Sequence, residues 1–469
     1  MQGTPGISLI IQKEGRLSVT RTLIEHLALF VNETTAEKIP SDVKEKAKIR
    51  IMDFLAALAM GMGSGVENFV LNAPCIPSSP EAMVLFSGKL LPAADAAACN
   101  SYIATSSGME DGSRYAGAHP SSGIIPPALA AAQITGASGE ALIAAIILAY
   151  EVHLRIGYAI YPYVLQRGFH SSAILAPPGA ATAVGKLMGL DAHELSSALS
   201  LACLSSGGLV CAFDAYPAKC YQIARAVKGG FEAALLAKKG MPGPARALEE
   251  GFLKAYGNAQ TLDLNDLGSR FLVGESYLKL HGGCRHIHPA IDAVLDMRAT
   301  DAVKPENVAE IFVGITSAAH AMERENAGNH TDARFNTPFL VAVALKEGEV
   351  SDEQITEALL ADKTIKALCT KTRVVVDPAL DVNFPAERGA IVNIKLKDGR
   401  TIHRQLRFPL GEPENPLSTE VVGKKFKKSL SGILPSDKIG FIYDFLQNLE
   451  YQKNLVPFFN TIVKETSNR

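Results

Sequence analysis

The feature that most constrains the fold is a long succession of Ala- and Leu-rich segments, which runs from Val19 to Leu280. Apolar residues recur in these segments at three- and four-residue spacings, as they do on one face of a helix. Short breaks rich in Gly, Pro and Ser separate the segments, and such breaks are typical of loops. The pattern predicts helices over residues 20–31, 41–60, 93–106, 123–134, 139–158, 178–188, 191–205, 219–239 and 243–255.

The pattern changes after about residue 300, where apolar and polar residues alternate as in half-buried strands. Strands are predicted over 308–315 and 372–377, and a hairpin over 390–403 is predicted around the Asp398-Gly399 turn. Further helices are predicted over 288–298, 337–346, 351–360, 418–426 and 435–448. The sequence therefore predicts a mainly α protein. A large all-helical domain is expected over 1–280 and 411–469, and a smaller α+β domain over 281–410.

The composition argues against nucleic-acid and membrane partners. The net charge is −2 and the 46 Lys and Arg residues are spread along the chain, so no basic surface is predicted. The longest apolar run, residues 141–150, is shorter than the ~18 residues that a membrane span needs, so it predicts a buried helix. The seven cysteines form no CxxC pair and the first residues do not resemble a signal peptide, which predicts free thiols and a cytoplasmic location.

Titratable residues gather in four of the breaks between helices, and the first break holds the most varied set. Glu110, Asp111, Ser113 and Arg114 precede His119. A carboxylate beside an imidazole can fix its tautomer and raise its pKa, and an arginine can bind a substrate carboxylate through two hydrogen bonds. Polar groups in loops between buried helices tend to line a pocket. The alternative is a solvated acidic loop that caps the next helix.

The next two breaks each hold one candidate residue. His170 stands in a Gly-Phe-His-Ser-Ser segment, and Lys219 follows Pro217 in a turn between apolar helices. His170 could transfer a proton, and Lys219 could neutralise a carboxylate or an enolate. Taken alone, a structural histidine and a surface lysine are the more common situations.

The fourth break, KLHGGCRHIH at residues 279–288, is the densest polar cluster in the sequence. It includes Lys279, Cys284, Arg285 and His288. A structural zinc site needs about four ligands in paired clusters, and the sequence lacks the second pair. We therefore expect an anion pocket built from Lys279 and Arg285 rather than a metal centre.

Short segments in a fixed order resemble the MmgE/PrpD family, which includes 2-methylcitrate dehydratase, cis-aconitate decarboxylase and iminodisuccinate epimerase. The resemblance covers nearly the whole chain. Its segments include IRIMDFLAALAMG from residue 49, HPS from residue 119, YEVHLRIG from residue 150, ATAVGKLMG from residue 181 and ARF from residue 333. The resemblance implies a helical domain with a smaller α+β domain, a homodimer, no metal or organic cofactor, and an active site in a cleft between the domains.

The resemblance also implies roles for particular residues. His119 and His170 match the two active-site histidines of the family and are expected to exchange a proton as base and acid. Ser113, and the Ser171-Ser172-Ala173 segment after the second histidine, depart from the residues that are usual in the family, which leaves the substrate open. Catalytic roles are expected for His119, His170, Lys219, Lys279 and Asp111, and substrate contacts for Glu110, Ser113, Arg114, Cys284 and His288.

The function implied by the resemblance is that of a cofactor-independent lyase acting on a small di- or tricarboxylate. Dehydration is expected first and decarboxylation second. The lysines would hold the carboxylates, and Glu110 or Asp111 would orient His119. Two alternatives remain open: an epimerase or isomerase that uses the same two histidines, and a non-catalytic binding protein of the same fold.

Overall fold

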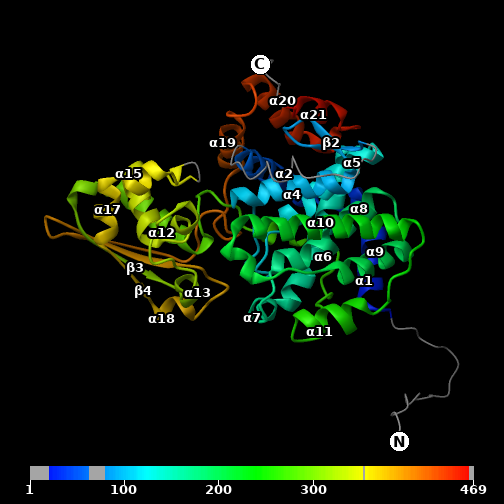
Figure 1. Ribbon diagram of the computed structural model, residues 1–469, viewed down its shortest axis with the longest axis horizontal. Coiled ribbons are helices and arrows are strands. Elements are labelled where there is room, and N and C mark those ends of the chain that lie inside the picture. Colours follow the sequence, from blue (N-terminus) through cyan, green and yellow to red (C-terminus); the bar gives the residue numbers. More distant parts are fainter. Residues whose placement is uncertain (1–20, 63–79, 352–353, 464–469) are drawn as a thin grey trace, which may run out of the picture.

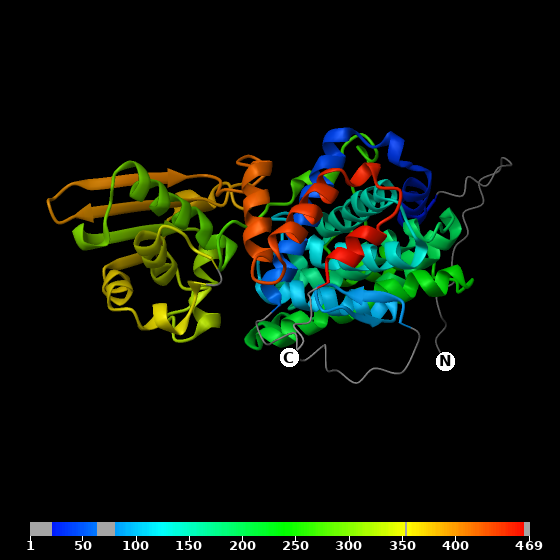
Figure 2. The same cartoon turned by 90° about the horizontal axis from the view of Figure 1, so that it is seen from above.

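Two hydrophobic cores organise the part of the chain that the computed structural model describes, which is residues 21–62, 80–351 and 354–463. The larger core draws its buried residues from Ile24 to Leu278 and again from Val422 to Ile462. The smaller core lies between Ile287 and Leu396. Figures 1 and 2 show the two corresponding lobes side by side, with α19 (Thr419–Leu430) on the edge of the helical lobe that faces the smaller one. The mainly α fold with a smaller α+β part is confirmed, and the exact domain boundaries remain predictions.

The larger lobe is built almost entirely from helices. Side-chain caps define several of its helix starts: Thr22 with Glu25, and Asp191 with Glu194, form capping boxes, which satisfy amides at the N-terminus. The main helices are α1 (Leu23–Glu33), α2 (Ser41–Gly61), α4 (Ala93–Ser107), α5 (Pro120–Thr135), α6 (Gly139–Ile160), α8 (Ser171–Leu187), α9 (Ala192–Ser205) and α10 (Tyr216–Lys238). The shorter or later helices are α7 (Tyr163–Gln166), α11 (Leu253–Tyr256), α19, α20 (Ser436–Gln447) and α21 (Val456–Thr461).

Three local features of this lobe differ from the predictions. A short hairpin of β1 (Ala82–Val84) and β2 (Lys89–Leu91) was not anticipated. The helix predicted over 243–255 is a π-helical turn, Ala247–Phe252, followed by α11. The helix predicted over 178–188 begins earlier, at Ser171, and continues through Pro177 and Pro178. The first residue of the helix predicted over 20–31 lies outside the described residues.

Helix α6 contains the apolar run that the sequence assigned to a buried helix. Its 22 residues are long and apolar enough to cross a membrane by length and composition. However, 89% of its most apolar window is buried inside the protein, as expected of a core helix. The prediction of a buried helix is confirmed.

The smaller lobe contains a four-stranded sheet in the order β4-β3-β5-β6. Its strands are β3 (Val308–Ile315), β4 (Thr372–Val376), β5 (Ala390–Leu396) and β6 (Thr401–Leu406). Strand β4 runs parallel to β3 with Ile311 opposite Thr372, whereas β5 pairs antiparallel with both β3 and β6. The Asp398-Gly399 turn closes the predicted hairpin, because Gly399 adopts a φ of 93° that favours glycine.

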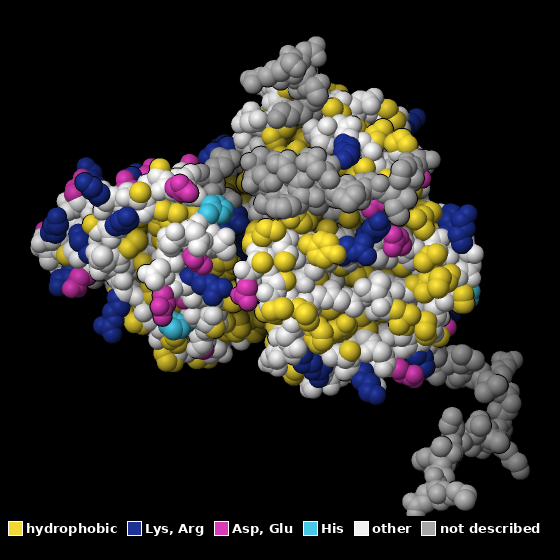
Figure 3. Space-filling view, viewed as in Figure 1, with side chains coloured by type: hydrophobic (Ala, Val, Ile, Leu, Met, Phe, Trp, Pro, Cys, Tyr) yellow, Lys and Arg dark blue, Asp and Glu magenta, His cyan; other side chains and the backbone are white. Residues whose placement is uncertain are grey.

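Helices cover one side of this sheet, where α12 (His288–Thr300), α15 (Thr337–Glu347) and α17 (Lys363–Thr370) lie in Figure 1. Shorter helices complete the lobe: α13 (Ser317–His320), α14 (His330–Ala333), α16 (Glu357–Ala361) and α18 (Pro378–Asp381). The helix predicted over 351–360 starts only at Glu357, after the N-cap Thr356, and residues 352–353 lie outside the described part. Figure 3 shows Lys and Arg side chains scattered among acidic ones on the visible face, without a continuous basic surface.

Candidate active site

Five of the predicted residues form one electrostatically linked group. Glu110 follows α4, His119 and His170 are the N-cap residues of α5 and α8, Lys219 lies near the start of α10, and Lys279 lies in the segment that leads to the smaller lobe. The Nζ of Lys219 is 3.9 Å from Glu110 Oε1, and the Nζ of Lys279 donates a hydrogen bond of 2.7 Å to the carbonyl of Gly108. The group therefore lies where the helical lobe meets the connection to the α+β lobe.

The two histidines hold equivalent positions on two similar helices. In each helix the N-cap histidine is followed by serines and by a proline pair at the same distance, Pro126-Pro127 in α5 and Pro177-Pro178 in α8. The backbone N–H of His119 donates to Ser172 Oγ at 3.0 Å, so the two N-termini touch. Gly123 faces Ala176 and Gly179 faces Ile124 further along, which makes the helices parallel.

This arrangement places the positive ends of two helix dipoles at the same site. A helix N-terminus favours an anion and disfavours a cation. Each histidine at these ends is therefore biased toward its neutral form, while the region around it attracts carboxylates. A histidine whose positive charge is suppressed at a helix N-terminus can still act as a hydrogen-bond donor or as a base.

Glu110 is the buried carboxylate at the centre of the group. Its side chain is fully buried, and neither carboxylate oxygen accepts a hydrogen bond from a residue in the described part of the chain. Burial raises the pKa of Glu110, but the charges of Lys219 and Lys279, together with His119 once it is protonated well below neutral pH, outweigh burial and hold the pKa below its ordinary value. Glu110 is thus an ionised group whose stabilisation comes from nearby cations.

The cations of the site include two buried lysines. Tyr216 packs between Lys219, whose Nζ is 5.0 Å from the ring centre, and Arg334, whose guanidinium is 5.3 Å from it. Burial opposes protonation of Lys219, but Tyr216 and Glu110 raise its pKa above the ordinary value. Burial lowers the pKa of Lys279 to about 8. Lys219 and Lys279 both act on Glu110, and this pair of buried lysines suits a substrate with several carboxylates.

Both histidines are neutral near pH 7. Burial lowers the pKa of His119 to about 4, with Glu110 opposing the change and the two lysines adding to it. Burial also lowers the pKa of His170 well below its ordinary value, and Lys219 and His119 lower it further. Each ring can therefore accept or donate one proton without already carrying a positive charge.

Asp111 is at the site, but its carboxylate does not orient His119. Oδ1 accepts the backbone N–H of Ser121 at 2.9 Å and so caps α5, while Oδ2 accepts the Tyr150 hydroxyl at 2.9 Å and lies 3.8 Å from Arg50 Nε. The atom that contacts His119 Nδ1 is the backbone carbonyl of Asp111, at 2.6 Å. The predicted orienting role therefore passes from a side chain to the main chain.

Arg114 and Ser113 lie beside the group but are already engaged. The Arg114 guanidinium donates to Glu412 at 3.0 Å and pairs with Glu414. Its Cζ also lies 4.9 Å from the centre of the Tyr115 ring. Ser113 Oγ accepts the backbone N–H of Ala116 within its own loop. These ion pairs connect the loop that follows α4 to the segment that precedes α19. Because two carboxylates already pair with the Arg114 guanidinium, its predicted role in binding substrate is not favoured.

Cys284 and His288 lie at the start of the smaller lobe. Burial raises the pKa of the Cys284 thiol, which lies in the electrostatic field of Lys279. His288 is fully buried, and its Nδ1 lies 3.1 Å from Arg285 Nη1. The Arg285 guanidinium also donates to the carboxylate of Glu412. Arg285 was expected to form an anion pocket with Lys279, but in the structure it pairs with this internal carboxylate. Substrate contacts for Cys284 and His288 remain predictions.

Three residues of the site were not singled out from the sequence. Tyr216 and Arg334 supply the aromatic and cationic surroundings of Lys219. Gln222, one helical turn after Lys219, donates to His170 Nδ1 at 2.7 Å. An uncharged glutamine has no chemical signature in a sequence, and only its spacing from Lys219 on α10 could have indicated it.

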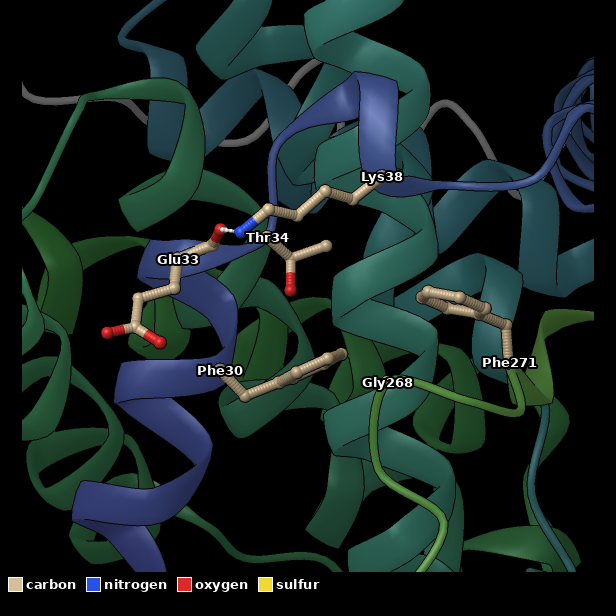
Figure 4. A pocket seen from close by; sticks show the side chains of 6 residues that line it. All are labelled: Phe30, Glu33, Thr34, Lys38, Gly268 and Phe271. Atoms are coloured by element: carbon tan, nitrogen blue, oxygen red, sulfur yellow. Dashed lines mark hydrogen bonds between the residues drawn. The ribbon is translucent and has the colours of Figure 1, made fainter.

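Two surface hollows lie apart from these residues. One has a volume of about 480 Å³ and is lined by Tyr115, Tyr158, Tyr161, Pro162, Phe384 and Pro385. The other, of about 200 Å³, lies between α1 and the segment around Gly268, and Figure 4 shows Lys38 reaching back to the carbonyl of Glu33 across its rim. Within the described ranges, no group of three or more His, Cys, Asp or Glu side chains is placed to hold a metal ion.

Comparison with known proteins finds relatives that are named for decarboxylation and for dehydration. A cis-aconitate decarboxylase-like protein of Aspergillus oryzae is 26% identical over 469 aligned residues, which cover 90% of this chain and 94% of the relative. The cis-aconitate decarboxylase of Aspergillus terreus is 24% identical, over 92% of this chain and 94% of its own. A 2-methylcitrate dehydratase-like protein of Aspergillus oryzae is 24% identical over 60% of both chains.

Family descriptions match both lobes. The description "MmgE/PrpD N-terminal domain" matches residues 25–265, and "MmgE/PrpD C-terminal domain" matches residues 281–445. The second match extends past the sheet into α19 and α20, which pack on the helical lobe. Since these matches cover most of the sequence, the chain belongs to the MmgE/PrpD family.

Proposed function

We propose that this protein is a cofactor-independent lyase that acts on a small di- or tricarboxylate. The observation that carries the proposal is the group of two neutral histidines and two lysines around the ionised Glu110. Lyase chemistry on such a substrate builds negative charge beside a carboxylate while a proton moves. Preorganised cations stabilise that charge, and a neutral histidine with an open nitrogen transfers the proton.

Decarboxylation is the reaction that we place first. The relatives matched over about nine-tenths of this chain are named for decarboxylation, whereas the dehydratase-like relative is matched over 60%. In this reaction the bond to the departing CO₂ breaks, and its electron pair passes to the remaining carbon skeleton. Lys219 and Lys279 hold the remaining carboxylates and the developing charge. Lys279, with its pKa lowered to about 8 by burial, is also acidic enough to resupply a proton at neutral pH.

Dehydration is the second candidate, because the same site offers both partners that this reaction needs. A base takes a proton from the carbon next to a carboxylate, the electron pair forms the double bond, and the hydroxyl leaves as water after an acid donates to it. His119 and His170 lie at adjacent helix ends and can share these two tasks.

The test is to incubate the purified protein with cis-aconitate, 2-methylcitrate and related polycarboxylates in deuterated water. Release of CO₂ supports decarboxylation, loss of the hydroxyl as water supports dehydration, and deuterium exchange with inversion alone identifies an epimerase. A protein that binds these anions but exchanges no deuterium and releases no product would refute the proposal in favour of a binding function.

We also propose that the protein is a homodimer in solution, in a cytoplasmic setting. Tyr221 and Leu236 are 59% and 45% exposed and lie four helical turns apart on the outer face of α10. Figure 3 shows apolar side chains gathered over this part of the helical lobe. Light scattering should give twice the chain mass, and a Tyr221→Glu, Leu236→Glu variant should shift toward the monomer. A monomeric wild-type protein would contradict the proposal.

A further inference from the structure

The side-chain amide of Gln222 is held in a single orientation by the backbone of Leu209. Its Oε1 accepts the Leu209 N–H at 2.8 Å, and its Nε2 donates to the Leu209 carbonyl at 3.1 Å. Rotating the amide by half a turn would set the NH₂ group against an N–H and the oxygen against a carbonyl, so both hydrogen bonds would be lost. Nε2 must therefore be the atom that faces His170.

The contact between Gln222 and His170 consequently has a defined direction. Gln222 Nε2 lies 2.7 Å from His170 Nδ1, and an amide nitrogen can only donate. His170 Nδ1 must accept this hydrogen bond, so the proton of the neutral ring is on Nε2. The surroundings keep the ring neutral, because it is 3% exposed, packs against Phe213 at 4.8 Å and faces the charge of Lys219.

His119 has the opposite arrangement. Its Nδ1 lies 2.6 Å from the carbonyl of Asp111, and a carbonyl oxygen can only accept. The Nδ1 of His119 must therefore carry the proton, which leaves Nε2 with a free lone pair. Two histidines at equivalent helix ends are thus prepared for different tasks, one by a side chain from α10 and the other by the main chain before α5.

We propose that Gln222 is the positioning residue that makes His170 the hydrogen-bond donor of the site, and that the pair works in one direction, with His119 Nε2 as the base. The inference rests on the proposed function and refines it. In dehydration, His119 Nε2 accepts the proton that leaves the substrate carbon, and the electron pair of that C–H bond forms the double bond. The Nε2 proton of His170 passes to the departing hydroxyl, which leaves as water, and Lys279 resupplies that proton. In decarboxylation, His170 Nε2–H donates a hydrogen bond to the oxygen on which negative charge develops.

The first test needs no substrate, so its result is independent of whether the lyase proposal holds. Nitrogen-15 NMR of the histidine-labelled wild-type protein, with the His170→Ala variant for assignment, reports which ring nitrogen bears the proton. We expect a protonated Nε2 and an unprotonated Nδ1 for His170, and the reverse for His119. A proton on His170 Nδ1 in the wild-type protein overturns the proposal.

The second test uses Gln222→Glu, which can still accept the Leu209 N–H but places a carboxylate against His170 Nδ1. That carboxylate draws a proton to Nδ1 and raises the pKa of His170. The variant should retain turnover at low pH, where both nitrogens are protonated. It should lose about 10²-fold in kcat at higher pH, where Nε2 is unprotonated.

Gln133→Glu is the matched control, because Gln133 lies on α5 and its Oε1 accepts the Met83 N–H at 2.9 Å. Its pH profile should equal that of the wild type. If Gln222 merely braced the 206–215 segment, Gln222→Glu would lower kcat equally at every pH, and that result would overturn the positioning role. Absence of turnover in the wild-type protein would count against the proposed function, while the NMR result would still decide the tautomers.

Discussion

Replacing Glu110 with glutamine should move the alkaline limit of activity to lower pH. Glu110 is the carboxylate that sustains the positive charge of both lysines, and it opposes the burial that lowers the pKa of Lys279 to about 8. Glutamine keeps the shape of the side chain and removes the charge. Because Lys279 must be cationic to hold a substrate carboxylate, the Glu110→Gln variant should lose activity at a pH where the wild type is still active.

The size of this change follows from the distance between Glu110 Oε1 and Lys219 Nζ, which is 3.9 Å. Two unit charges at this separation attract by about 4 kcal/mol at an effective dielectric constant of about 20. If a third of that energy acts on Lys279, its pKa falls by about 1. At about pH 7.5 the cationic fraction of Lys279 then drops about threefold, and kcat/KM should fall with it.

The assay is the pH dependence of kcat and kcat/KM on the substrate identified by the polycarboxylate panel. Asp95→Asn serves as the control, since Asp95 pairs with Lys228 of α10 at 2.5 Å in a partly exposed position. Such surface pairs contribute about 0–1 kcal/mol, so this variant should keep the wild-type profile. An unchanged alkaline limit in Glu110→Gln would refute the assignment of Lys279 as the titrating cation.

Three further outcomes are expected. His170→Ala should lower kcat by about 10²–10⁴-fold without changing the thermal melting of the protein; full activity in this variant would remove His170 from the mechanism. Gly179→Ala should lower both stability, by about 1–3 kcal/mol, and kcat, because the added methyl would lie 3.0 Å from Ile124 and 3.1 Å from His153 and push α5 away from α8. A stable variant with normal kcat would contradict this. The free energy of unfolding should decrease as the pH falls below about 6.5, by about 1.4 kcal/mol per pH unit for each buried neutral histidine, because the unfolded chain binds protons that the native chain excludes. His153, whose pKa burial lowers to about 3, should contribute one such proton, so urea unfolding of His153→Leu should show a shallower dependence; equal slopes would contradict the assignment.

Strand positions were predictable because their alternation is a local property of the sequence. The predicted 308–315 strand and the Asp398-Gly399 hairpin match β3, β5 and the start of β6. The start of α8 was not predictable in the same way, because Pro177 and Pro178 each remove a helical N–H and normally end a helix. Close packing against α5 and α10 keeps this helix continuous, and such tertiary contacts are not visible in a local pattern.

The identities of the site residues were more predictable than their partners. His119, His170, Lys219 and Lys279 carry groups whose chemistry is evident from the residue type. The hydrogen bonds that determine their protonation are not evident, since they come from a backbone carbonyl at Asp111 and from an amide on another helix. For Arg114 the residue type was misleading. Its charge predicted a contact with a substrate carboxylate, whereas two glutamates more than 290 residues away in the sequence already pair with it.

The parallel packing of α5 and α8 has a consequence for how such an enzyme can change. The separation of the two rings is set by the contacts of Gly123 with Ala176 and of Gly179 with Ile124, deep in the core, rather than by any surface loop. The proton-transfer pair is therefore fixed by the same interactions that stabilise the fold. Loops near the site, such as the one that holds Ser113, can vary without altering that separation. Substrate preference can thus diverge among proteins of this architecture while the acid–base geometry is inherited unchanged.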